Sequence, residues 1–306
     1  MLRRLPQHWP LGTLFVLILA ANETALRSGA ELRSYFLSLC AASVAVIAVT
    51  VGWLEGSLPS HGQRAVLWIA LLIGFNLHIL TSLVIGALLL PFLILAWLRG
   101  RRALFRQMLT PAVVGGSVFL AVSMVQMPMW QANTTRFWIP AGADAARWAI
   151  DYAVLRAAEA NWLALIAGVA GAALLLLGDL RARRPSPALE CMAVLGAGIA
   201  LSTALLIGLH LLRPVVTERY LTALIPAVAM GIAVGACAAM RALPARLGNA
   251  LVLGASALTV WSLVGNANRT AERKSWEGTS AKLEQLVRQC PDSPVHIDPP
   301  FWNAFA

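Results

Sequence analysis

Residues 65–98 read AVLWIALLIGFNLHILTSLVIGALLLPFLILAWL, an apolar stretch with a few polar side chains near its middle. A membrane-spanning helix needs about 20 apolar residues, so the stretch is too long for one span and short for two. The polar residues of the interruption are Asn76, His78, Thr81 and Ser82. We therefore predict two short, tilted helices joined at a polar break, where these side chains satisfy the backbone groups that the break frees.

The composition places the whole chain in a membrane. Of its 306 residues, 59% are hydrophobic and only 12% are charged, whereas soluble domains carry about 25% charged residues. We predict an all-α polytopic membrane protein of about eight transmembrane helices, in residues 1–265, followed by a short external tail, residues 266–306. The expected spans are 11–21, 34–54, the two helices within 65–98, 111–125, 162–177, 189–210, 221–240 and 247–264. Residues 1–21 also fit a signal peptide.

The arginines predict the orientation. The formal charge of +10 reports topology here and not nucleic-acid binding. One set of connections is strongly basic, and its only acids are Glu55 and Asp179. Basic connections face the cytoplasm, so the other set is expected outside. These basic residues are Arg3, Arg4, Arg64, Arg99, Arg101, Arg102, Arg106, Arg181, Arg183, Arg184, Arg241 and Arg246. We expect a bacterial inner membrane protein whose site faces the periplasm.

Several common cofactor motifs are missing from the sequence. It has no glycine-rich phosphate loop with lysine, no His-Glu-x-x-His and no Cys-x-x-Cys, and its four cysteines have neither disulfide-framework nor zinc-site spacing. We therefore expect no metal and no cofactor, and regard ATP-driven and metalloprotease chemistry as excluded.

The connection at residues 211–223, LLRPVVTERYLTA, concentrates charge beside a bilayer, where charge is costly and marks function. Arg213 and Arg219 flank Glu218, and arginine binds phosphate oxygens through two parallel hydrogen bonds. This pattern predicts capture of the phosphate of a lipid-linked substrate. Anchoring to lipid headgroups, with Tyr220 in an interfacial aromatic belt, explains it equally simply.

Further candidates fall on the same predicted side. Glu23, Arg27 and Glu31 are four residues apart and share one helix face. They fit an interfacial helix whose charges face water, or a site in which the arginine holds one of the carboxylates in place. His78 fits a hydrogen-bonded structural group or a catalytic one. Trp138, in Trp138-Ile139-Pro140, fits an interfacial belt or a surface on which sugars stack.

Four short motifs stand out along the chain. They are Glu31-Leu32-Arg33-Ser34-Tyr35, Asn76-Leu77-His78, Trp138-Ile139-Pro140, and Arg213-Pro214 with Arg219-Tyr220-Leu221. Taken together, they resemble the GT-C membrane glycosyltransferases, in particular the bacterial protein-mannosyltransferase-like enzymes that include the Rgt-like sugar transferases, and they follow that family's order over most of the chain.

The resemblance implies a function. Such enzymes move a sugar from a polyprenyl-phosphate carrier to an acceptor glycan, lipid or protein on the non-cytoplasmic face, inverting the anomeric centre with an acidic base. Arg219 and Arg213 would hold the carrier phosphate and stabilise it as a leaving group. The implied substrate-binding residues are Arg33, Tyr35, His78, Trp138, Arg213, Glu218, Arg219 and Tyr220, with membrane lipids as further partners.

The sequence departs from the family before the first motif. There the expected base lies in a long external loop, with several spans between it and the Glu-x-Arg-x-Tyr signature, whereas one short apolar run precedes Glu31 here. We therefore expect the C-terminal part of such an enzyme, with its catalytic base upstream and Glu23 or Glu31 as weak substitutes. A lipid-linked sugar transporter or flippase, and a non-catalytic membrane partner, are the alternatives.

Overall fold

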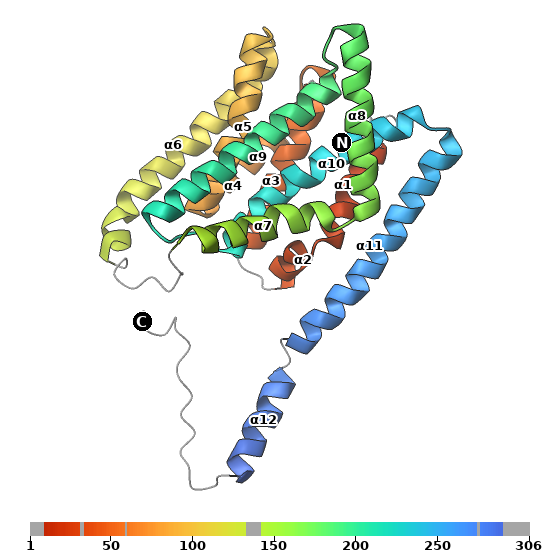
Figure 1. Ribbon diagram of the computed structural model, residues 1–306. Helices are drawn as coiled ribbons and strands as arrows, with labels where there is room; N and C mark the ends of the chain where they lie inside the picture. Colours follow the sequence, from red (N-terminus) through yellow and green to blue (C-terminus); the bar gives the residue numbers. More distant parts are fainter. Residues whose placement is uncertain (1–8, 31–33, 59, 133–141, 274–275, 290–306) are drawn as a thin grey trace. The chain divides into compact units, whose positions relative to one another are not determined.

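The computed structural model describes residues 9–30, 34–58, 60–132, 142–273 and 276–289, and these are helical apart from short connections (Figure 1). Within this described part, seven helices are long and apolar enough to cross a membrane, and the shorter apolar helix Trp9–Ala21 accompanies them. The prediction of an all-α polytopic membrane protein is confirmed. Such a chain satisfies its backbone hydrogen bonds within each helix, as hydrocarbon requires.

The helices follow one another with short connections. They are α1 (Trp9–Ala21), α2 (Glu23–Ala30), α3 (Ser34–Glu55), α4 (His61–Leu77), α5 (Ile79–Leu98), α6 (Arg102–Ala132), α7 (Ala143–Glu159), α8 (Trp162–Ala182), α9 (Pro187–Leu212), the 3-10 helix η3 (Glu218–Leu224), α10 (Ile225–Ala242), α11 (Ala245–Arg273) and α12 (Trp276–Gln289). The chain forms two compact units, Met1–Leu263 and Val264–Ala306. In the second, Arg288 and Glu284 of α12 form an ion pair at 2.6 Å.

The predicted break in residues 65–98 lies at His78, which is the only residue between α4 and α5 and has an extended backbone. Ser82 donates its hydroxyl hydrogen to the carbonyl oxygens of Phe75 and His78, as expected for a side chain that satisfies freed backbone groups. Thr81 instead donates to the Ser38 hydroxyl of α3, at 3.1 Å. The stretch is therefore two helices and not one tilted helix.

Helix α10 forms the centre of the first unit and contacts α1, α3, α8 and α9 (Figure 1). Its apolar side chains are small, and α8 meets it with almost no side chain between the two backbones. A Cβ atom at Gly171 of α8 would overlap the Gly235 carbonyl oxygen, and one at Gly235 would overlap the Gly168 carbonyl oxygen. Small residues that let backbones touch are the usual basis of helix packing in a bilayer.

Arginine-rich connections meet at one end of the first unit. The Arg101 guanidinium donates to the Trp53 carbonyl oxygen at 2.8 Å and lies 4.4 Å from the centre of the Trp53 ring. Glu190, in the first turn of α9, pairs with Arg99 at 2.6 Å and with Arg101 at 3.6 Å. These contacts bring the ends of α3 and α5 and the start of α9 together. The connections predicted to lie on the basic side of the membrane are therefore found at one end of the bundle. Glu190 itself was missed as an acid of this end, because it lies within an apolar run.

Several helix boundaries differ from those expected, most clearly around α6. Helix α6 starts at Arg102, well before the predicted span at 111–125, and it includes Pro111 and Pro128. Pro111 lies within the helix although a proline removes one backbone hydrogen bond. The connection between the expected spans 111–125 and 162–177 contains a further helix, α7, of which Ala146, Ala149 and Ala153 are buried.

Candidate functional site

An aromatic cluster of Tyr35, His78 and Tyr220 lies at the end of the first unit away from the arginine-rich connections. The His78 and Tyr220 rings stack, with centroids 4.6 Å apart and planes 21° apart. Tyr35 packs edge-on against both, at 5.5 Å from Tyr220 and 6.1 Å from His78. These residues come from three separate sequence motifs, so the fold brings together positions that are far apart in the chain.

Each member of the aromatic cluster is positioned by an irregular piece of backbone or a helix end. Tyr35 lies in the first turn of α3, and its carbonyl oxygen accepts a hydrogen bond from the Thr222 hydroxyl at 3.5 Å. Tyr220 lies in η3, where its backbone N–H donates to the Thr217 carbonyl oxygen at 3.1 Å. This 3-10 turn delays the start of α10 and turns the tyrosine toward α3 and α5.

The hydrogen bonding of His78 fixes its neutral tautomer. The Leu80 backbone N–H donates to His78 Nδ1 at 3.2 Å, which caps α5. Nδ1 is thus an acceptor, so the neutral ring carries its hydrogen on Nε2. His78 precedes the apolar span that begins at Ile79, and burial lowers the pKa of His78 below its ordinary value of 6.5. At neutral pH the cluster therefore presents an uncharged imidazole whose Nε2–H has no hydrogen-bond partner among the described residues.

The loop from α9 to η3 is braced by His210, which the sequence analysis treated only as the end of a span. His210 is buried, and its Nδ1 accepts a hydrogen bond from the Val216 backbone N–H at 3.1 Å. The bond closes the loop that contains Arg213. A histidine in the last turn of an apolar helix, just before an Arg-Pro pair, is the signal that could have identified it.

The structure describes the remaining candidates only in part. Arg213 is exposed and ends α9, where its backbone N–H donates to the Leu209 carbonyl oxygen at 2.8 Å. Glu23 is half-buried at the start of α2. The other candidates lie outside the described residues, wholly or by their side chains. Glu31, Arg33 and Trp138 are not described, and Glu218, Arg219 and Arg27 are described only as backbone within η3 and α2.

No protein-family model, curated protein or solved structure matches this chain. The chemistry of the site is therefore argued from its own residues. Two phenol rings and a neutral imidazole offer flat apolar faces together with hydrogen-bond donors, a combination that suits a polyhydroxylated ring. Within the described residues, no group of three or more histidine, cysteine, aspartate or glutamate side chains is placed to hold a metal ion.

The lowered pKa of His78 predicts an acid-sensitive fold. Because the unfolded chain takes up a proton at this residue more readily than the folded one, His78 contributes stability above about pH 6.5 that is lost as the pH falls. We expect the melting temperature in detergent to drop less between neutral and mildly acidic pH in His78→Asn than in the wild type. Asparagine can still cap α5 but does not titrate. Identical pH profiles of the two proteins would contradict this assignment.

Proposed function

We propose that the chain is part of a GT-C-type membrane glycosyltransferase that uses a polyprenyl-phosphate-linked sugar. The observation that carries the proposal is the aromatic cluster. Tyr35, His78 and Tyr220 belong to three of the four motifs on which the resemblance rests, and their rings are in contact. These contacts support the proposal because a common binding surface requires the three motifs to meet at one end of the bundle.

In the proposed mechanism the aromatic cluster holds the sugar beside the phosphate. The sugar stacks on the ring faces, and the Nε2–H of His78 donates to a sugar oxygen. Arg219, in η3 next to Tyr220, and Arg213, at the end of α9, bind the carrier phosphate and stabilise the charge that develops on it as the sugar leaves. The acidic base is supplied from outside the described residues.

The orientation follows from the positive-inside rule. Arg99, Arg101 and Arg241 lie at the end of the bundle opposite the aromatic cluster. If that end faces the cytoplasm, the aromatic cluster faces the other side of the membrane, where a lipid-linked donor would meet its acceptor. We accordingly propose a bacterial inner membrane location with the site on the periplasmic face.

Binding of the carrier tests the proposal without requiring the catalytic base. The purified protein is placed in nanodiscs, and retention of polyprenyl phosphate is measured by native mass spectrometry. We expect Arg219→Ala to weaken binding at least about tenfold, because it removes a charge-assisted contact to phosphate. The matched control is Arg246→Ala, an exposed arginine at the other end of the bundle, which should bind as the wild type does. Equal binding by Arg219→Ala and the wild type would refute the proposal.

A further inference from the structure

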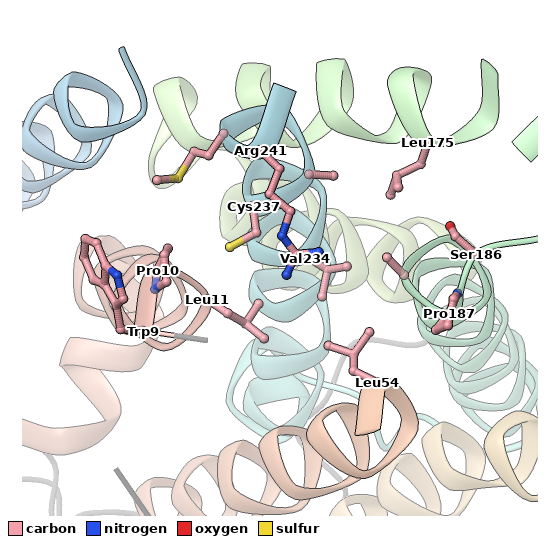
Figure 2. Close-up of a pocket in the computed structure, with 13 residues that line it drawn as sticks. Trp9, Pro10, Leu11, Leu54, Leu175, Ser186, Pro187, Val234, Cys237 and Arg241 are labelled. Carbon is pink, nitrogen blue, oxygen red and sulfur yellow. The ribbon is translucent and has the colours of Figure 1, made fainter. Parts of the chain in front are cut away.

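A cavity of about 480 Å³ opens at the arginine-rich end of the first unit, away from the aromatic cluster (Figure 2). It lies among the start of α1, the end of α3, the start of α9 and the last turns of α8 and α10. Its size falls within the range of about 300–1,000 Å³ that is usual for small-molecule sites. Representative wall residues are Trp9, Leu11, Leu54, Leu175, Val234 and Met240.

Arg241 supplies a positive charge to this cavity. It lies in the last turn of α10, where side chains lean back toward the helix N-terminus. Figure 2 shows its side chain extending into the cavity, with the guanidinium nitrogens beside Val234 and near Cys237. Arg241 has no hydrogen bond or ion pair with any residue that the structure describes.

Two acids of this end of the bundle contact other groups and do not pair with Arg241. Asp179 accepts hydrogen bonds from the backbone N–H and the hydroxyl of Ser186, at 2.7 and 2.9 Å. Glu190 is paired with Arg99 and Arg101. Neither carboxylate forms an ion pair with Arg241, so its guanidinium stays available to an anionic group of a ligand. The start of α9, at Ser186 and Pro187 in the cavity wall, adds the positive end of a helix dipole.

The walls and the charge together define the ligand. Apart from Arg241, Ser186 and Cys237, the lining side chains are apolar, which favours a ligand with an apolar part. A molecule with an acyl chain and a phosphate group satisfies both features. Basic recesses between membrane helices at the cytoplasmic side are general sites for anionic lipid headgroups.

We propose that this cavity binds one anionic phospholipid, whose phosphate pairs with Arg241 and whose glycerol and upper acyl chains lie against α1, α3 and α10. The site is distinct from the proposed sugar-transfer site, which lies at the other end of the bundle. Its occupant would fill space between α1 and α10 that the described residues leave open, and so would stabilise the packing of α1.

Native mass spectrometry with phosphatidylglycerol as the probe tests the proposal. The detergent-purified protein is titrated with phosphatidylglycerol, and separately with phosphatidylcholine or inorganic phosphate. We expect one phosphatidylglycerol molecule to bind more tightly than further copies. Neither phosphatidylcholine nor inorganic phosphate should displace this first molecule when added to the complex. Arg241→Gln should weaken this first binding about tenfold, as expected for the loss of one charge-assisted contact. Arg246→Gln, also exposed at this end, should have no effect.

A second variant keeps the test valid if Arg241→Gln does not fold. Ala238→Phe fills the cavity from α10 while Arg241 stays in place, and it should also abolish the first tight binding. The proposal would be overturned if folded Arg241→Gln and Ala238→Phe bound phosphatidylglycerol as tightly as the wild type does. The absence of a preferred phosphatidylglycerol molecule would also overturn it, as would its displacement by inorganic phosphate, which would show that the acyl chains do not contribute.

Discussion

Gly235→Val is expected to destabilise the first unit strongly, whereas Gly231→Val, one helical turn earlier on α10, is expected to be accepted. A side chain at Gly235 would meet the backbone of α8 at Gly168, and backbone atoms cannot move aside as a flexible side chain can. A Cβ atom at Gly231 meets nothing within 4 Å. Both changes alter helix propensity by the same amount, so the difference between them isolates the helix contact.

The size of the effect follows from the position of α10. Forcing α8 and α10 apart would disrupt the core at its centre, and overpacking alone costs about 1–3 kcal/mol. We expect about 3 kcal/mol or more for Gly235→Val, a large share of the stability of a typical domain. The measurement is the yield of monodisperse protein after detergent extraction, followed by the melting temperature. Gly235→Val protein that matches Gly231→Val in both would contradict the packing described here.

Glu190→Ala is expected to destabilise the arginine-rich end strongly. Glu190 is only 9% exposed and pairs with two arginines, so its loss leaves Arg99 and Arg101 repelling each other without a counter-charge. Breaking a fully buried pair costs about 3–5 kcal/mol. Because Arg99 and Arg101 are 45% and 25% exposed, water screens part of that cost, and we expect about 2 kcal/mol.

The matched control for Glu190 is an ion pair at the surface. Asp151 pairs with Arg147 at 3.9 Å on α7, and both side chains are more than half exposed. Asp151→Ala should cost less than about 1 kcal/mol. Thermal unfolding of the wild type and both variants in the same detergent provides the comparison. Equal melting temperatures for Glu190→Ala and Asp151→Ala would show that the buried carboxylate does not stabilise the fold.

Length and polarity were enough to predict the break at His78. The apolar stretch at 65–98 was too long for one span, and its polar residues lay near the middle, so a helical hairpin was the solution that avoids unpaired backbone groups in lipid. The distribution of arginines among the connections separately predicted that His78 and Tyr220 lie on one side of the membrane, and Tyr35 continues the helix face of Glu23, Arg27 and Glu31 on that side. The ring contacts among Tyr35, His78 and Tyr220 agree with that prediction, and their role in binding substrate stays a proposal.

Other features depend on contacts that no local pattern reveals. Glu190 was assigned to an apolar span because its neighbours in the sequence are apolar. Its ion pairs with Arg99 and Arg101, which lie far away in the sequence, explain why a carboxylate stands there. The closeness of α8 and α10 requires matching glycines on helices that are distant in sequence. The early start of α6 was missed because Arg102 and Arg106 read as a charged loop, whereas arginine is a good helix former.

Helix α3 is fastened at both of its ends. Trp53 near its last turn lies under Arg101, which also reaches Glu190 of α9, and Tyr35 in its first turn packs against Tyr220 of η3. Rocking of α9 and α10 against α3, of the kind that alternating-access transporters use, would have to break these contacts at one end or the other. If these contacts persist, the two ends of α3 stay in place, as the proposed stationary transfer site requires, whereas a carrier that opens to each side in turn would have to break them.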